Sequence, residues 1–186
     1  MKKAAKKIRN SGKNSGKLNI YLIGEKIFSN SKDAFTLYDQ SNFGESVKGK
    51  IFYSAAESFF LFVIGRANVY LGKKKLNHDS FMAEIVKKEP NFFTRYSVYS
   101  DLRSKGYIVK SALKFGAEFR VYDRGVKPGE DHAKWVVFPV HEAYALTWQE
   151  FAAKNRVAHS TKKKLLIGVV DDEGDVSYWE CRWVKP

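Results

Sequence analysis

Cysteine is nearly absent from this sequence of 186 residues, and metal-binding patterns are missing with it. The one cysteine, Cys181, can form no internal disulfide, which is typical of a protein from a reducing compartment. It also excludes every zinc motif built on cysteines, and the four histidines show no HExxH pattern or other close ligand spacing. The sequence therefore predicts no metal site, and we expect no cofactor.

Long apolar segments are missing as well. The longest uninterrupted apolar run is Phe59–Ile64, whereas a membrane-spanning helix needs about 20 residues. The basic N-terminus is not followed by the apolar segment of a secretory signal, so we expect a cytoplasmic protein without a membrane partner. No P-loop, GxGxxG or GxSxG motif occurs, which argues against the nucleotide-binding and hydrolase classes that those motifs mark.

Acidic residues are scarce relative to basic ones. The chain has 33 Lys and Arg against 20 Asp and Glu, which gives a formal net charge of +13 and an isoelectric point of about 9.7. More than half of this excess comes from residues 1–18, which contain seven basic residues and no acidic one. A strongly basic chain most often binds nucleic acid, although a solubilising tail on a mildly basic domain gives the same total.

Composition divides the chain into a tail and a first domain. Residues 1–18 contain almost no large apolar residue, which predicts a disordered basic tail. Residues 19–90 are expected to form a small mixed α/β domain that ends at Pro90. Its clearest signal is the capping box Ser54–Glu57, which opens an apolar helix ended by Gly65. The other elements expected here are strands at Leu18–Ile23 and Asn68–Leu71 and a helix over Ser80–Lys88.

Residues 91–186 predict a second domain, a mixed-sheet α/β unit flanked by helices. A helix is expected from Phe92 to Gly106, and the capping box Thr147–Glu150 opens another that runs to about Val157. The chain as a whole is thus expected to be an α/β protein of the α+β type. The strands predicted in this domain are Tyr107–Ala112, Glu118–Tyr122, Ala133–Val140, Lys164–Val170 and Val176–Val184.

Polar residues gather at the rims of these predicted strands. Tyr122 ends one strand, His132 opens the next after a loop, and Lys162–Lys164 precede a buried strand. A tyrosine that takes a proton, a histidine that gives one and a lysine that holds developing charge have the chemistry to break a phosphodiester. Each also has an ordinary structural role, as a half-buried strand residue, a loop histidine and a solvated strand edge. Spacing alone does not bring the three together.

Longer motifs carry a resemblance to a known family. Residues 96–110 (YSVYSDLRSKGYIVK), 115–125 (FGAEFRVYDRG), 131–132 (DH), 156–160 (RVAHS) and 162–167 (KKKLLI) follow one another, and an acidic turn at 171–175 comes last. Their order and spacing resemble those of the archaeal tRNA-intron splicing endonuclease family. The resemblance covers residues 96–186 in detail and the N-terminal half in outline.

This resemblance implies a catalytic role for three residues. Tyr122 matches the general base that deprotonates the ribose 2′-hydroxyl beside the splice site, and His132 matches the acid that protonates the leaving 5′-oxygen. Lys163 matches the residue that stabilises the pentavalent transition state, with Lys162 and Lys164 as alternatives in register. The implied reaction is metal-independent cleavage of precursor tRNA at bulge–helix–bulge junctions, which leaves a 2′,3′-cyclic phosphate and a 5′-hydroxyl. DNA lacks the 2′-hydroxyl and is excluded as a substrate.

The resemblance also implies RNA-binding residues. Arg156 matches an arginine that stacks on a base flipped out of the RNA bulge, and guanidinium planes suit that task. Near a helix C-terminus, an arginine is also favourable for the helix dipole alone. Tyr178 or Trp179 is expected to supply an opposing stacking face, and Lys162 and Lys164 to contact the RNA.

The acidic turn is unusual in so basic a chain. In the family, such a turn inserts into a basic cleft of a neighbouring subunit, and the last strand pairs with another copy. A solvated hairpin turn is the alternative. A single copy of the two domains implies a homotetramer, or a heterotetramer with a structural subunit. The interface residues implied are Asp171, Asp172, Glu173 and Asp175.

Two other functions stay open at this point. The first is a noncatalytic RNA-binding or structural subunit of such a complex, although an inactive subunit does not need Tyr122, His132 and Lys163 together. A DNA-junction nuclease usually requires carboxylates and a divalent metal, and no matching acidic constellation is present. Activity in EDTA separates that class from the others.

Overall fold

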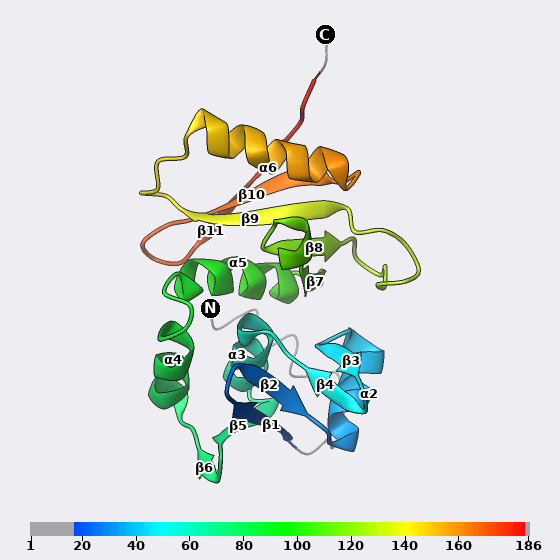
Figure 1. Cartoon of the computed structure of the whole chain (residues 1–186), viewed down its shortest axis with the longest axis vertical. Helices are drawn as coiled ribbons and strands as arrows, with labels where there is room; N and C mark the ends of the chain where they lie inside the picture. The colour runs from blue at the N-terminus through cyan, green and yellow to red at the C-terminus, as the bar shows by residue number, and fades with distance from the viewer. Residues whose placement is uncertain (1–16, 185–186) are drawn as a thin grey trace. The chain divides into compact units, whose positions relative to one another are not determined.

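The computed structural model describes residues 17–184 of a chain that divides into two compact units, Met1–Phe92 and Phe93–Pro186 (Figure 1). The tail predicted over residues 1–18 lies, as far as residue 16, outside the described residues. Each unit combines helices with one mixed β-sheet, so the α/β class expected from the sequence is confirmed. No helix within the described range is long and apolar enough to cross a membrane.

A six-stranded sheet organises the first unit. It contains the parallel pair of β1 (Leu18–Ile23) and β5 (Ala67–Leu71), in which Leu18 lies opposite Ala67. Side chains of β1 alternate between buried and more exposed positions, as a half-buried strand requires. The order of the sheet is β3-β4-β2-β1-β5-β6, with β2 at Lys26–Ser29, β3 at Glu45–Val47, β4 at Lys50–Phe52 and β6 at Lys74–Lys75.

The predicted capping box of the first unit is present. Ser54 Oγ accepts a hydrogen bond from the Glu57 backbone, and the Glu57 carboxylate accepts one from the Ser54 backbone. Glu57 is buried and also accepts the backbone N–H of Gly44, so the same carboxylate fixes both the helix start and a loop. The helices of this unit are α2 (Lys32–Ser41), α3 (Ala55–Val63) and α4 (His78–Val86).

A five-stranded sheet, in the order β11-β10-β9-β8-β7, organises the second unit. The central pair β9–β10 is parallel, and the other pairs are antiparallel. The last strand ends at Cys181, three residues before the predicted end at Val184, because its ladder with β10 stops where Leu165 lies opposite Cys181. The bounds are β7 Ile108–Ser111, β8 Phe119–Tyr122, β9 Trp135–His141, β10 Lys164–Val170 and β11 Val176–Cys181.

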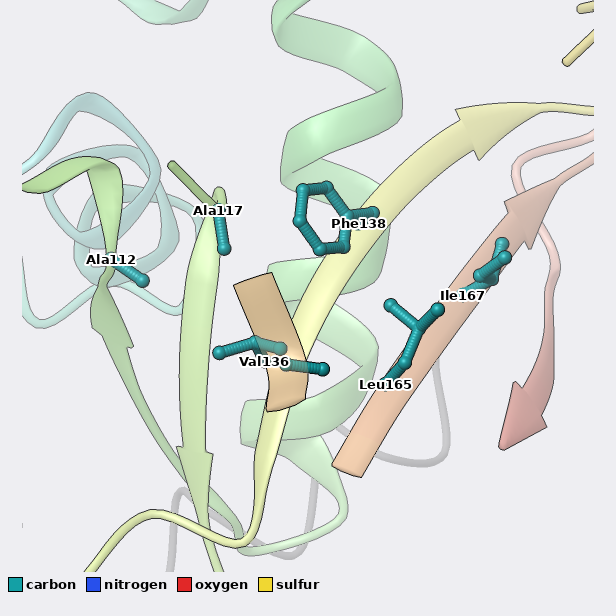
Figure 2. Packing of buried hydrophobic residues seen from close by; sticks show 7 residues of the cluster. Ala112, Ala117, Val136, Phe138, Leu165 and Ile167 are labelled. Atoms are coloured by element: carbon teal, nitrogen blue, oxygen red, sulfur yellow. The ribbon is translucent and has the colours of Figure 1, made fainter. Parts of the chain in front are cut away.

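One helix covers each face of this sheet (Figure 1). The helix α5 (Phe92–Ser104) lies on one face, and α6 (Trp148–Ser160), which opens with the predicted Thr147–Glu150 capping box, lies on the other. Figure 2 shows the core on the α6 face, where β9 and β10 meet. The residues of this core are Ala112, Ala117, Val136, Phe138, Ala158, Leu165 and Ile167.

The opposite face is packed against α5. The Tyr99 ring lies with its centre 5.8 Å from that of Phe119. A Cβ added to Gly168 would lie 2.9 Å from Cγ2 of Val98, so only glycine at this position lets the helix approach β10 to this distance. The sheet is therefore buried on both faces, and its two ends are left to carry polar residues.

Candidate active site

The register of three strands brings their ends to one edge of the second sheet. Val121 of β8 lies opposite Trp135 of β9, and Trp135 lies opposite Lys164 of β10. β8 ends one residue after Val121, whereas β9 and β10 begin at Trp135 and Lys164. The last residue of β8 and the segments that lead into β9 and β10 are therefore neighbours. Tyr122, His132 and Lys163 belong to these three segments.

Tyr122 points to the α6 face of the sheet. Phe119 contacts α5, and side chains alternate along a strand, so Arg120 and Tyr122 point the opposite way. Arg120 accordingly pairs across the sheet with Val136, a member of the α6-face core. The Tyr122 side chain is 5% exposed, and within residues 17–184 its hydroxyl makes no hydrogen bond. The Tyr122 ring is thus fixed by packing, whereas its hydroxyl oxygen has no hydrogen-bond partner among the described residues.

His132 lies near the end of the loop between β8 and β9, and this loop is closed at its base. Asp123 and Lys134 form an ion pair of 2.7 Å, and the Lys134 backbone N–H donates to the carbonyl oxygen of Val121. The Lys134 ammonium holds the pKa of the Asp123 carboxyl below its usual value, and Asp123 raises the pKa of Lys134. The Asp131 carboxylate accepts the backbone N–H of His132. The loop backbone is therefore held on both sides of an exposed His132 ring.

The three consecutive lysines have three different environments. Lys162 is exposed and adopts a left-handed φ of 53° in the turn after α6. Lys163 is half-buried, and its ammonium donates to the carbonyl oxygen of Thr161 at 2.8 Å. Lys164 forms an ion pair of 2.8 Å with Glu180 on β11. The triplet is therefore not uniform, and the assignment of Lys163 over its neighbours stays a prediction.

Glu180 ties the strand ends together on the α5 face. Besides the Lys164 ammonium, its carboxylate accepts the indole N–H of Trp135 at 2.8 Å. These two donors, Lys164 first, lower the pKa of Glu180 below its usual value. Lys164, which the resemblance offered for RNA contact, thus has a structural partner that links β9, β10 and β11.

Arg156 lies in an aromatic pocket between α6 and the segment after β11. The pocket has a volume of about 440 Å³, and Arg156 lines it together with Trp148, Phe151, Arg182 and Trp183. Trp148 and Trp183 are 85% and 64% exposed. Sequence analysis missed both tryptophans, because Trp148 reads as part of the capping box and Trp183 as the end of a strand. The only signal in the sequence is the residue type itself: tryptophan, the largest apolar side chain, occurs at two positions that belong to no apolar repeat.

The two residues expected to oppose Arg156 lie on different sides of β11. The Tyr178 hydroxyl donates to Asp101 of α5 at 2.8 Å, and burial together with this carboxylate raises the pKa of Tyr178 above its usual range. Tyr178 therefore lies on the face opposite to α6. Trp179 alternates with it and is 63% exposed, so of the two it is on the side of Arg156.

The acidic turn lies at the other end of the β9–β10 pair. The Asp171 carboxylate accepts the backbone N–H groups of Glu173 and Asp175, at 3.0 and 2.9 Å, so it holds the turn itself. Asp172 lies 3.2 Å from Nε2 of His141. Asp172, Glu173 and Asp175 are exposed. No group of three or more His, Cys, Asp and Glu able to hold a metal ion occurs among residues 17–184.

Comparison with known protein families matches both halves of the chain. The model of the tRNA intron endonuclease catalytic C-terminal domain matches residues 92–178, and the model of the tRNA intron endonuclease N-terminal domain matches residues 19–82. This chain belongs to the tRNA intron endonuclease family. The resemblance inferred from the motifs is confirmed, and it extends to the first unit, where the sequence motifs agreed only in outline.

Archaeal relatives of this family align with most of the chain. The tRNA-splicing endonuclease of Thermococcus kodakarensis is 40% identical over 166 residues, which cover 89% of this chain and 97% of the relative. That of Pyrococcus furiosus is 36% identical over 169 residues, covering 90% and 97%. That of Nanoarchaeum equitans is 44% identical over 136 residues, covering 70% and 87%.

Proposed function

We propose that this chain cleaves precursor tRNA at exon–intron junctions that fold as a bulge–helix–bulge. The observation that carries the proposal is the register of β8, β9 and β10. β8 ends where β9 and β10 begin, so the segments that contain Tyr122, His132 and Lys163 are neighbours. Family membership supports it independently, because relatives that align over most of both chains are called tRNA-splicing endonucleases.

The reaction is a transesterification within the RNA. Tyr122 removes the proton from the ribose 2′-hydroxyl, and the resulting oxygen attacks the adjacent phosphorus. The bond from phosphorus to the 5′-oxygen breaks, and His132 gives a proton to that oxygen. Lys163 stabilises the negative charge of the pentavalent transition state. The products are a 2′,3′-cyclic phosphate and a 5′-hydroxyl. No water is consumed, so the enzyme is an RNA lyase, and no step requires a metal ion.

The local contacts support these roles. A general base and a general acid must be free to meet the substrate, and within residues 17–184 neither the Tyr122 hydroxyl nor the His132 ring is held by a hydrogen bond. The connecting loop is held instead through the ion pair between Asp123 and Lys134. The backbone is thereby fixed while the reactive groups stay available, which is the arrangement that preorganised catalysis needs.

RNA binding and assembly complete the proposal. Arg156 stacks on an unpaired base, with Trp179 as the opposing face, and Lys162 contacts the backbone phosphates. The exposed carboxylates Asp172, Glu173 and Asp175 contact a basic surface of another subunit in a homotetramer, or in a heterotetramer with a structural subunit. Asp171 takes part only by shaping the turn.

The test is cleavage of a bulge–helix–bulge RNA by the purified chain in EDTA, followed by analysis of the product ends. We expect cuts in both bulges, with cyclic phosphate and 5′-hydroxyl ends. Ends of the opposite type, or activity that depends on an added divalent metal, contradict the mechanism. If the folded chain stays inactive with candidate partner subunits present, the noncatalytic RNA-binding subunit is the correct function.

A further inference from the structure

Three consecutive lysines without ion pairs lie at one outer strand of the six-stranded sheet. Lys73, Lys74 and Lys75 belong to the hairpin of β5 and β6, and all three are exposed. In the part of the chain that the structure describes, none of them forms an ion pair. Lysines elsewhere do: Lys87 and Lys134 each lie 2.7 Å from a carboxylate oxygen. This hairpin is therefore a local concentration of positive charge, in which Lys74 interacts electrostatically with Glu84 of α4 without forming an ion pair.

Protection of the sheet edge accounts for part of this charge. β6 is the last strand of the six-stranded sheet, and lysine on an edge strand prevents pairing with another chain. The edge strand itself consists of Lys74 and Lys75 alone, so edge protection accounts for these two lysines. Lys73 lies in the turn between β5 and β6 and does not protect a strand edge. Three adjacent like charges repel one another, and an anion bound there removes that cost.

A pocket of mixed lining adjoins the hairpin. It has a volume of about 500 Å³, and Lys75 lines it together with Lys17, Asn68, Asn77 and His78. Lys17 reaches it because β1 and β5 are parallel neighbours, with the Leu18 backbone N–H donating to the carbonyl oxygen of Arg66. Part of the lining is apolar, and the amides of Asn68 and Asn77 each make a hydrogen bond within the chain.

The two ammonium groups, of Lys17 and Lys75, suit an anionic ligand such as a phosphate. The pocket and the hairpin thus place positive charge from Lys17 and Lys75 at the β6 edge of the sheet, whereas β3 forms its other edge strand (Figure 1).

We propose that Lys73–Lys75, Lys17 and the pocket between them form a second RNA-binding surface, the lysine hairpin surface. It binds the sugar–phosphate backbone of the precursor tRNA at a distance from the cleaved bond. This inference rests on the proposed function for the identity of the RNA. Three adjacent ammonium groups are suited to contact phosphates and not base edges. Such contacts position an RNA without reading its sequence.

The experiment measures binding separately from cleavage. The probe is a precursor tRNA with 2′-deoxyribose at both cleaved positions, and its dissociation constant is measured by fluorescence anisotropy from 50 to 200 mM salt. The full chain is compared with K73A/K74A/K75A. The matched control K32A/K48A/K50A removes the same charge from α2 and the β3–β4 hairpin, at the opposite edge of the sheet.

We expect the lysine hairpin variant to bind about tenfold more weakly at 100 mM salt. Each phosphate contact contributes about 0.7 to 0.9 to the slope of log K against log salt, so that slope falls by about 2. The control variant keeps the affinity and slope of the unchanged chain. Lys75→Gln, a milder change, lowers the slope by about 0.7 to 0.9. Equal losses in both triple variants, or an unchanged slope in all of them, overturn the proposal.

Two further outcomes separate this inference from its alternatives. If the lysine hairpin variant binds RNA normally but loses self-association in analytical ultracentrifugation, the surface is a protein interface and the proposal is wrong. If the unchanged chain fails to cleave any bulge–helix–bulge RNA while the slope still falls in the variant, the proposed function fails and the RNA-binding surface stands. If the unchanged chain cleaves normally and the variant binds RNA as tightly as the unchanged chain, the proposed function stands and the RNA-binding surface is wrong.

Discussion

The two ends of the β9–β10 pair in the second unit carry polar residues of different kinds. At one end, the Tyr122 hydroxyl and the His132 ring make no hydrogen bond within the described residues. At the other end, Asp171 accepts two backbone N–H groups, and His141 contacts both Asp172 and a backbone N–H. The contrast lies in these residues: Asp171 and His141 are engaged in local contacts, whereas the Tyr122 hydroxyl and the His132 ring are not.

This difference separates candidate catalytic groups from structural ones without reference to residue type. A polar side chain that is fixed by packing but lacks an internal partner has interactions left for a substrate. A polar side chain that closes a turn has already used them. By this criterion Tyr122 and His132 are available, whereas Asp171 and Lys164 are committed to the fold. Lys163 does not meet the criterion, because its ammonium donates to the Thr161 carbonyl oxygen, and its proposed role requires that this hydrogen bond be exchanged for one to the substrate.

The largest effect is expected from Tyr122→Phe. It removes the general base while keeping the buried ring, so the cleavage rate falls by about 10² to 10⁴. Binding of the 2′-deoxy RNA is expected to stay within about twofold. Tyr144→Phe, which removes a hydroxyl bonded to Glu150 at the acidic end, is the matched control and keeps the rate. Single-turnover cleavage measures both. Parallel loss of binding and cleavage in Tyr122→Phe would refute the catalytic role.

Gly168→Ala tests the middle of the sheet, between the two ends. Its new Cβ meets Cγ2 of Val98 at 2.9 Å, and overpacking of this kind costs about 1 to 3 kcal/mol of unfolding free energy. Urea denaturation measures the loss. Removal of the opposing methyl groups in a Val98→Ala background is expected to recover part of it. If the two changes are simply additive, α5 does not pack against β10 as described.

Asp171→Ala tests the structural role at the acidic end. It leaves two backbone N–H groups of the turn without their acceptor, so we expect a loss of about 1 kcal/mol in unfolding free energy. Asp172→Ala removes a similar charge without this loss. Thermal unfolding of both variants measures the difference. If the two variants lose the same unfolding free energy, the loss comes from the removed charge and not from the broken hydrogen bonds of the turn.

The smallest effect concerns pH at the start of α6. Hydrogen bonds from Tyr144 and from Thr147 lower the pKa of Glu150 from its usual value of 4.5 to about 2. Because the folded-state pKa is depressed, the stabilisation is present above about pH 4.5 and is lost as the pH falls toward 2. Glu150→Gln is therefore expected to flatten the pH dependence of unfolding in this window. Glu142→Gln serves as the control, and an unchanged profile in Glu150→Gln contradicts the contact.

Local signals predicted much of the fold. The two capping boxes and the apolar run of β10 depend on neighbours within the chain, and the structure confirms all of them. The elements between β1 and α3 were not predicted: α2 is mostly polar and buries only Ala34 and Leu37, and β2, β3 and β4 are each at most four residues long. Strand pairing depends on contacts distant in sequence, so no pattern fixed which strand ends would meet.

The candidate site shows the same limit. Residue type and motif resemblance named Tyr122, His132 and Lys163, but only the register of β8, β9 and β10 makes their segments neighbours. The ion pair of Lys164 with Glu180 and the position of Trp183 beside Arg156 both join residues from separate elements. Such contacts leave no trace in local composition.

The most direct test of the central claim changes the RNA and not the protein. A bulge–helix–bulge substrate is made with a single 2′-deoxyribose on the 5′ side of one scissile phosphate, and the unchanged chain is added in EDTA. If the 2′-hydroxyl is the nucleophile, the modified junction stays intact while the other junction is cut at its normal rate. Cleavage at the modified junction would contradict the account, because a different nucleophile would then attack the phosphorus.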